Sequence, residues 1–182
     1  MTAEYTLIKS GQGDVQTNSR VKRMNSVERV RIALKEAGHP DTIAGFSAST
    51  RTAADAAGAI GCTVGQIAKS IVFRSMDQPV LVIASGVNRV DVAKVESALG
   101  LPVDRADPIW VREVTGFIVG AVAPVGHLTT PLTLIDQDLF VLDPIWAAAG
   151  SPTHVFRTTA SALVSLSNGK VADVKQVNDR TN

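Results

Sequence analysis

The sequence predicts a single α+β domain in which helices flank a strongly curled, barrel-like mixed β-sheet. Helix-type and strand-type segments follow one another without a regular strand–helix–strand repeat, which argues against a doubly wound parallel sheet. The chain has 182 residues, 45% of them hydrophobic, which is enough for one domain with a sizeable core. Several short strand-like runs are separated by turns, a pattern typical of a curled or closed sheet.

The first 24 residues differ from the rest of the chain. Residues 1–24 are polar and lack periodicity, so we expect a loosely ordered arm before a domain that spans residues 25–182. The arm ends in the basic residues Arg20, Lys22 and Arg23. These side chains could contact phosphates, although a solvated tail is the simpler interpretation.

Five helices are predicted, each from a capping residue at its start and a stop at its end. Ser, Thr, Asp and Asn accept hydrogen bonds from the first turn of a helix, and glycine tolerates the left-handed backbone at its end. Asn25 with Glu28 resembles a capping box, and Pro108 stands where a helix tolerates proline. The predicted helices cover 25–37, 50 or 52 to 60, 91–99, 107–115 and 159–166.

Apolar runs rich in β-branched residues predict the strands. The polar link at 75–79 is short, so the two runs on either side of it are expected to form a hairpin. Two later segments, at 144–149 and 153–157, lie between the last predicted strands. Strands are predicted at 42–46, 67–74, 80–85, 117–123, 132–135 and 171–174.

The strand predicted at 67–74 carries a lysine inside an otherwise apolar run. Alternate side chains of a strand point to opposite faces, so Lys69, Ile71 and Phe73 share one face and Ser70 lies on the other. An unpaired buried ammonium is costly. Either Lys69 reaches solvent at a strand end, or its charge serves a pocket for an anionic ligand.

Residues 115–127 contain glycines within a strand-like pattern. Gly120, Pro124 and Gly126 suggest a loop whose backbone faces a ligand, because glycine in a strand often marks a bulge or a close backbone approach. Exposed N–H groups in such a loop could bind a carbonyl oxygen or an oxyanion. The alternative is a bulge and turn that only bend the sheet.

A third glycine-containing turn begins at Gly150 and includes His154. An imidazole titrates near neutral pH, so His154 could orient a water molecule or bind substrate. The alternative is that a single histidine beside a turn has no functional role.

Other classes of site are excluded by the sequence. The three histidines and Cys62 show no metal-ligand spacing, and no P-loop, dinucleotide-binding or Gly-x-Ser-x-Gly motif occurs, so we predict no metal and no cofactor. Cys62 follows an apolar helix and is interpreted as a small core residue. The clustered Asp136, Asp138 and Asp143 are interpreted as solvated turn residues.

Charge and hydropathy limit the partners. The net charge of +1 is too small for broad electrostatic binding of nucleic acid, so any such contact must be local. No apolar run reaches the roughly 20 residues of a membrane span, and residues 1–16 lack the apolar core of a signal peptide. One cysteine precludes an internal disulfide, which fits a reducing compartment, and we expect the cytoplasm.

These motifs together resemble the YbaK/prolyl-tRNA-synthetase-associated editing domains, from about residue 26 to residue 177. No single motif is strong, but their order and spacing are specific. The motifs are Thr-Ala-Ala-Asp-Ala-Ala at 52–57, Ile-Ala-Lys-Ser-Ile-Val-Phe at 67–73, Gly-Val-Asn-Arg-Val-Asp at 86–91 with Lys94, Thr-Gly-Phe-Ile-Val-Gly at 115–120 with Pro124 and Gly126, Ala149-Gly150, Leu163, and Val-Ala-Asp at 171–173.

The resemblance implies an enzyme that hydrolyses the ester between a wrongly attached amino acid and the 3′ end of a tRNA. It also implies a curled mixed sheet with flanking helices. The strand lysine, Lys69, is then the key functional residue, and Gly120 lies at the substrate. The expected partners are the tRNA acceptor end and an aminoacyl-tRNA synthetase. The other predicted substrate-binding residues are Phe46, Thr52, Ser85, Gly116, Pro124, Gly126, Gly150 and His154.

The sequence departs from the family pattern at two places. Ser70 follows the lysine where threonine is common, and His154 stands near the aspartate of the branch that removes cysteine from tRNA-Pro. The end of the chain is most similar to that branch, so substrate choice stays open at His154. A non-catalytic module that binds a tRNA end or an aminoacyl nucleotide is the alternative, and a regulatory small-molecule binder is a third hypothesis.

Overall fold

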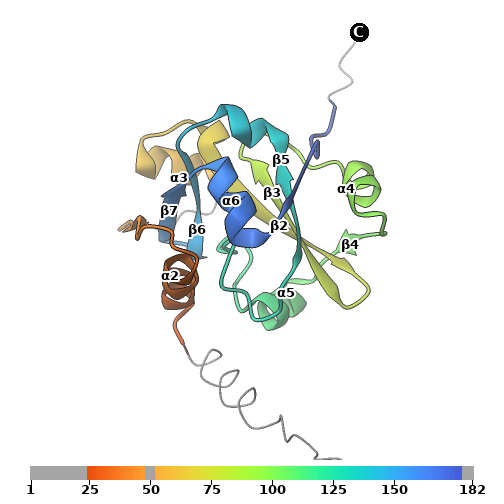
Figure 1. Cartoon of the computed structure of the whole chain (residues 1–182), viewed down its shortest axis with the longest axis horizontal. Helices are drawn as coiled ribbons and strands as arrows, with labels where there is room; N and C mark the ends of the chain where they lie inside the picture. The colour runs from red at the N-terminus through yellow and green to blue at the C-terminus, as the bar shows by residue number, and fades with distance from the viewer. Residues whose placement is uncertain (1–23, 48–51, 178–182) are drawn as a thin grey trace, which may run out of the picture.

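A mixed eight-stranded sheet runs through the molecule, with helices packed around it (Figure 1). The computed structural model describes residues 24–47 and 52–177. The strand order is β1-β7-β6-β2-β3-β5-β8, and β4 pairs with the end of β2. The strands are β1 (Ile43–Gly45), β2 (Ile67–Ser75), β3 (Gln78–Ser85), β4 (Asp104–Arg105), β5 (Leu132–Asp136), β6 (Ile145–Ser151), β7 (His154–Thr158) and β8 (Lys170–Ala172).

The pairings make the sheet mixed, as the sequence predicts. The strands β2 and β3 form the expected antiparallel hairpin, while β2 pairs with β6, β3 with β5, and β5 with β8 in parallel. In the described part of the chain the edge strands β1 and β8 do not pair with each other, so the path is open. The barrel-like curvature therefore stays a prediction.

The helices begin and end close to the predicted positions. The Asn25 side chain accepts from the Val27 N–H, whereas Glu28 pairs with Arg31 at 3.0 Å and leaves the cap. A complete capping box forms instead at Thr52. The helices are α2 (Ser26–Glu36), α3 (Ala53–Ile60), α4 (Val92–Leu99), α5 (Pro108–Thr115) and α6 (Ala160–Ser167), with short 3₁₀ turns η1 (Val64–Gln66) and η2 (Gln137–Val141).

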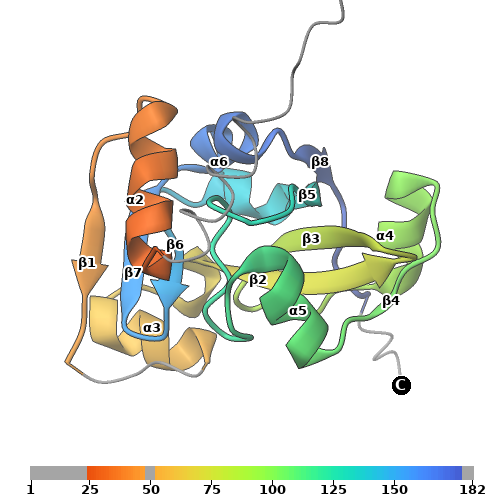
Figure 2. The same ribbon diagram turned by 90° about the horizontal axis from the view of Figure 1, so that it is seen from below.

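Both faces of the sheet are covered, because β3 is buried on both of its sides. Leu81 and Ile83 belong to the larger core, to which α2, α5 and α6 contribute. Val80 and Val82 belong to a second core with α4. Figure 2 shows α4 at the end of the sheet away from α2 and α3, and β1, β7 and β6 side by side near α2. A central strand buried on both faces has the continuous apolar sequence seen here.

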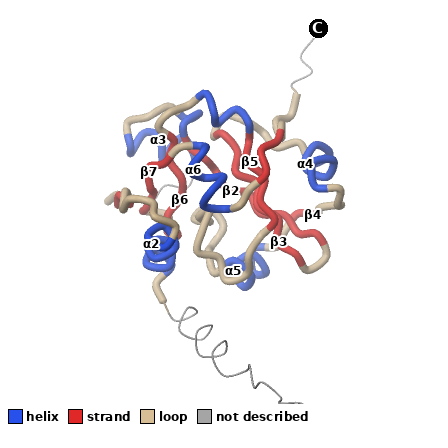
Figure 3. Tube along the Cα trace, in the orientation of Figure 1, coloured by secondary structure: helices blue, strands red, loops and turns tan. Residues whose placement is uncertain are grey.

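The strand predicted at 117–123 is wrong. This segment is a loop between α5 and β5, as Figure 3 shows. Phe117 and residues 121–125 are buried, although the segment pairs with no strand of the described chain. Its apolar sequence reflects packing against the core, and periodicity alone does not distinguish such a loop from a buried strand.

One predicted segment lies almost wholly outside the described residues. The arm predicted at 1–24, with its basic residues up to Arg23, lies outside the described residues except for Met24. No helix within 24–47 or 52–177 has both the length and the apolar sequence needed to cross a membrane.

Candidate functional site

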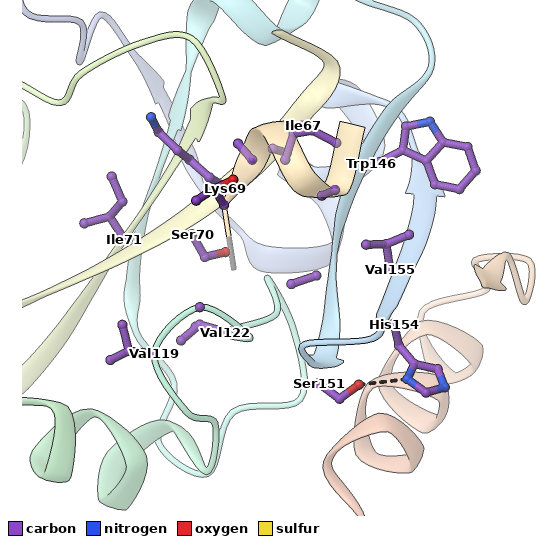
Figure 4. A pocket seen from close by; sticks show the side chains of 16 residues that line it. Ile67, Lys69, Ser70, Ile71, Val119, Val122, Trp146, Ser151, His154 and Val155 are labelled. Carbon is purple, nitrogen blue, oxygen red and sulfur yellow. Dashed lines mark hydrogen bonds between the residues drawn. The ribbon is translucent and has the colours of Figure 1, made fainter. Parts of the chain in front are cut away.

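A pocket of about 280 Å³ lies between β2, β6, β7, the start of α3 and the loop after α5 (Figure 4). Its lining is mainly small and apolar, with hydroxyl groups and one lysine. The lining residues are Thr52, Ala53, Ala56, Ile67, Ala68, Lys69, Ser70, Ile71, Val119, Gly120, Val122, Trp146, Ala148, Ser151, His154 and Val155.

Lys69 enters the pocket wall from β2, and its amine is held by main-chain oxygens. Nζ donates to the carbonyls of Gly86 at 3.1 Å and Asn88 at 2.6 Å. An ammonium has three donors, and the third N–H has no partner among the described residues. In Figure 4 the amine points away from His154 and also from Val119 and Val122 of the loop that carries Gly120. Lys69 is thus a fixed cation with one free donor.

The pKa of Lys69 is lowered from its usual range. Burial of the amine is the main cause, and the neighbouring charge of Arg89 acts in the same direction. The carboxylate of Asp136 opposes the change. No acidic side chain forms a salt bridge with Lys69 in the described part of the chain. The cation is therefore not neutralised by a direct ion pair.

Asp136 fixes the turn that holds the lysine. The prediction that Asp136 is a solvated turn residue is wrong, because its exposed fraction is 0%. Its carboxylate accepts hydrogen bonds from the Ser85 N–H (3.1 Å), the Asn88 side-chain amide (2.7 Å) and the Asp138 N–H (3.0 Å). A buried carboxylate needs such donors. The hydrogen bonds connect β5 to the turn whose carbonyls bind Lys69.

The opposite wall is a tight turn at Gly120. The Ala121 N–H donates to the carbonyl of Ile118 at 3.0 Å, which closes a four-residue turn. Gly120 has a φ of +87°, the conformation that the third position of a type II turn requires. In the described chain the N–H groups of Val119 and Gly120 have no partner. This turn offers unpaired donors beside the pocket.

A polar corner lies at the far side, where β6 meets β7. His154 Nδ1 is 2.7 Å from Ser151 Oγ and 3.0 Å from Thr153 Oγ1. The imidazole thus has one nitrogen engaged by hydroxyls. Nearby, Thr52 caps α3 by accepting from the Asp55 N–H at 3.1 Å. Figure 4 shows Ser151 and His154 on the side of the pocket away from Lys69.

The structure brings together four of the ten predicted site residues. Lys69, Gly120, Thr52 and His154 all line this pocket. The two residues given catalytic roles, Lys69 and Gly120, therefore share one cavity although 51 positions separate them in the sequence.

Three of the predicted glycines instead pack against α2. A Cβ on Gly116 would lie 2.6 Å from the Arg29 guanidinium, and one on Gly150 would lie 2.8 Å from the Ser26 carbonyl. A Cβ on Gly126 would lie 3.2 Å from backbone atoms of Arg29 and Val30. These close neighbours and the left-handed backbone at all three positions account for glycine there without a role at the substrate.

The remaining three predicted residues also lie outside the pocket lining. Ser85 is buried and donates to the Gly65 carbonyl at 2.8 Å. The Phe46 N–H bonds to the carbonyl of Thr153 at 2.8 Å. Pro124 is buried and lines a separate hollow beside His127.

Sequence reasoning missed several lining residues. Ser70 Oγ is buried, lines the pocket and has no partner in the described part of the chain. The sequence feature that could have identified Ser70 is its position next to Lys69 in the strand, with its side chain on the opposite face. Trp146 and Val122 come from segments that only the folded chain brings to β2, and no local pattern marks them. Within 24–47 and 52–177 no group of three His, Cys, Asp or Glu residues is arranged to hold a metal.

Known proteins are similar to this chain in sequence and in fold. The sequence model of the aminoacyl-tRNA editing domain matches residues 47–166. The uncharacterized protein YwhH of Bacillus subtilis (strain 168) is 30% identical over 147 residues, which cover 80% of this chain and 94% of that protein.

Two solved structures are similar over nearly their whole length. A crystal structure described as that of a candidate trans-editing enzyme for prolyl-tRNA synthetase has a TM-score of 0.80 and 42% identity, covering 85% of this chain and 99% of the other. A structure from a study of epitope backbone grafting onto scaffold proteins has a TM-score of 0.79 and 40% identity, covering 84% and 98%.

Proposed function

Since the chain belongs to the aminoacyl-tRNA editing domain family, we propose that it is a deacylase that removes a wrongly attached amino acid from tRNA in trans. One observation carries the proposal. Lys69 and the Gly120 turn line the same pocket, and one N–H of the lysine and two of the turn have no partner among residues 24–47 and 52–177. An ester placed between them would have a cation on one side and N–H donors on the other.

The Gly120 turn suits the carbonyl end of the ester. In the hydrolysis, water attacks the carbonyl carbon and negative charge develops on its oxygen. The N–H groups of Val119 and Gly120 would stabilise this oxyanion, and the loss of one such donor costs roughly 3–4 kcal/mol in known enzymes. The turn donates through its backbone, so no side chain at position 120 is needed.

The fixed amine of Lys69 suits the nucleotide end. Its third N–H would bind the terminal phosphate or a ribose hydroxyl of the tRNA and so hold the ester at the turn. Water is the nucleophile, and a ribose hydroxyl of the substrate assists its activation. The bond that breaks joins the acyl carbon to the ribose oxygen, and the products are free amino acid and tRNA.

The small apolar residues of the pocket suit a small side chain. Ala53, Ala56 and Ala148 line it together with Val122 and Val155, and a volume of about 280 Å³ leaves little room beyond the ester and ribose. We infer cysteine on tRNA-Pro as the first substrate to test, because the prolyl-tRNA synthetase named for the 42% identical structure points to that tRNA. We propose prolyl-tRNA synthetase as the protein partner. We propose the cytoplasm as the location, because the mischarged tRNA would be present there.

His154 and Thr52 complete the proposed contacts. His154, held by Ser151, lies at the edge of the pocket on the side away from Lys69 and would act on the amino acid or on the attacking water after its ring turns inward. Thr52 stands at the start of α3, where it lines the same pocket. The other six predicted residues are proposed to support the site, each through the packing or hydrogen bonds described above.

A deacylation screen tests the proposal. Purified protein is mixed with cysteinyl-, alanyl-, seryl- and threonyl-tRNA, and release of amino acid is followed with Lys69→Ala as the control. We expect wild-type protein to release at least one amino acid and the variant to release none. No release from any of these tRNAs would disprove the proposal.

The alternative, a non-catalytic binding module, uses the same pocket. It is favoured by the two carbonyls that already occupy the Lys69 amine. Tight binding of a tRNA end without turnover in the same screen would identify it.

A further inference from the structure

Arg29 on α2 is a buried cation bonded to the backbone of three separate segments. Its exposed fraction is 7%. Nη2 donates to the carbonyl of Gly116 at 2.7 Å, Nε to that of Gly126 at 3.2 Å, and Nη1 to that of Met24 at 3.4 Å. The guanidinium also lies over the ring of Phe117, 4.8 Å from its centre. The planar fork of an arginine suits several acceptors in fixed positions.

This cation has no acidic partner in the described part of the chain. Burial lowers the pKa of Arg29 from its usual value, so the environment does not favour the charge. Burying a charge without a counter-ion is costly. Here the hydrogen bonds to main-chain carbonyl oxygens are what stabilise the charge of Arg29. The role of Arg29 is therefore sought in the backbone segments whose carbonyl oxygens it binds.

The oxygens belong to the two ends of the loop that carries Gly120. Gly116 and Gly126 both have left-handed backbone, and the carbonyl of each accepts a hydrogen bond from the Arg29 guanidinium. The base of the loop is closed by hydrogen bonds from Leu128 and Thr129 to the carbonyls of Thr115 and Val114. Between these glycines the loop pairs with no strand of the described chain, and Arg29 is the side chain that bonds to both of them.

We propose that Arg29 is a positioning residue, which fixes the Gly120 turn over the pocket by holding the carbonyls of Gly116 and Gly126. The inference rests on the proposed deacylase activity, for which the turn supplies the donors to the oxyanion. Arg29 does not line the pocket and acts through the loop. Misplacing such a turn by about 1 Å can cost on the order of 100-fold in rate.

The test compares Arg29→Lys and Arg29→Gln with Asn25→Ala. Asn25 caps the same helix, so its loss weakens α2 without removing a bond to the loop. We expect both Arg29 variants to lose on the order of 100-fold in kcat with a smaller change in KM, Arg29→Lys losing less because an amine can hold one carbonyl. Asn25→Ala should keep its kcat at temperatures where it stays folded.

Hydrogen exchange of the hydrogen-bonded amides of Phe117 and Ala121 separates this inference from the proposed function. Faster exchange there in the Arg29 variants, with unchanged exchange in β2 and β3, is the expected result. Partial recovery of kcat in Arg29→Ala on adding guanidinium, far below denaturing concentrations, would support it further. Folded Arg29 variants with wild-type exchange or wild-type kcat would overturn it. If wild-type protein releases no amino acid, the proposed function fails, and the exchange result still decides whether Arg29 fixes the loop.

Discussion

The two walls of the pocket are built in different ways. The sheet wall, residues 67–71 of β2, is hydrogen-bonded to β3 along one edge and at its start to β6 along the other. The loop wall, residues 118–122, pairs with no strand of the described chain, and Arg29 of α2 bonds to the carbonyls of Gly116 and Gly126 on either side of it. One wall is fixed by a regular ladder of backbone hydrogen bonds and the other by a few long-range contacts. We therefore expect the sheet wall to supply a rigid cation and the loop wall to be the easier one to displace.

The largest expected effect is at Lys69, in the sheet wall. Lys69→Met keeps the apolar stem and removes the charge, and it should abolish amino-acid release while the protein stays folded. Lys69→Arg should retain part of the activity. The pKa of Lys69 is lowered mainly by burial. The wild-type rate should therefore fall as the pH rises, with a midpoint below the pKa of a free lysine. Uncatalysed ester hydrolysis is subtracted before the comparison. The Arg variant should lack this alkaline limb, and a wild-type rate that stays flat through that range would contradict the role of the cation.

The next effect concerns His127, which supports the loop wall. Its ring packs edge to face on Phe117, with centroids 5.3 Å apart. Burial lowers its pKa from 6.5 to about 4, so the unfolded chain binds the extra proton first and stability falls as the pH falls from 6.5 toward 4. This pKa difference corresponds to a loss of up to about 3 kcal/mol in the free energy of unfolding, at 1.36 kcal/mol per pKa unit.

The His127 effect is measured by denaturant unfolding of wild type and His127→Phe at several pH values. The variant keeps a ring beside Phe117 and removes the titration. The stability difference between the two proteins should narrow or reverse in favour of the variant as the pH falls through this window. A difference that stays constant from pH 6.5 to pH 4 would exclude His127 as the acid-sensitive group.

Asp136 tests how firmly the sheet wall is held from behind. Asp136→Asn keeps the shape but places a donor where three donors already converge, so the free energy of unfolding should drop by about 1–3 kcal/mol. The turn at 86–88 should loosen, and activity should fall with it. Asp143→Asn is the matched control, because Asp143 is exposed. Equal stability losses in the two variants would show that the buried network does not hold the turn.

The smallest predicted effect is on the loop wall itself. Gly120→Ala forces a side chain into left-handed backbone at a cost of about 1–2 kcal/mol. A Cβ there would meet nothing within 4 Å, so any loss of rate would come from the shape of the turn. Gly100→Ala is a close control, since Gly100 also has left-handed backbone and open space but ends α4. We expect similar stability losses in both and roughly a tenfold lower kcat only in Gly120→Ala.

The sheet wall was predictable from the sequence. The loop wall was predictable only in part, because Gly120 was identified but the segment around it resembled a strand. Capping residues and glycine stops located the helices, and the hairpin link located β2 and β3. The alternation around Lys69 holds, because Ala68 and Val72 pack into one core and Ile71 and Phe73 into the other. These signals act within a few residues.

The rest depended on contacts between distant segments. The run at 117–123 resembled a strand because its side chains are buried, yet no neighbouring strand is available to it in the described chain. Asp136 resembled a turn residue because two of its three donors belong to residues 48 and 51 positions away. The glycines at 116, 126 and 150 were correctly singled out, but their close neighbours belong to α2, which no local pattern connects to them.

The most direct test is whether both walls bind one ligand. A non-hydrolysable 3′-aminoacylamido analogue of the terminal adenosine is titrated into the protein while NMR follows the Lys69 side-chain amine and the backbone amides of Val119 and Gly120. The signals from both walls should shift together and saturate at the same ligand concentration. If only the Lys69 amine or only the Val119 and Gly120 amides change their chemical shifts while other residues of the protein show saturation with the ligand, the cation and the turn do not act on the same substrate.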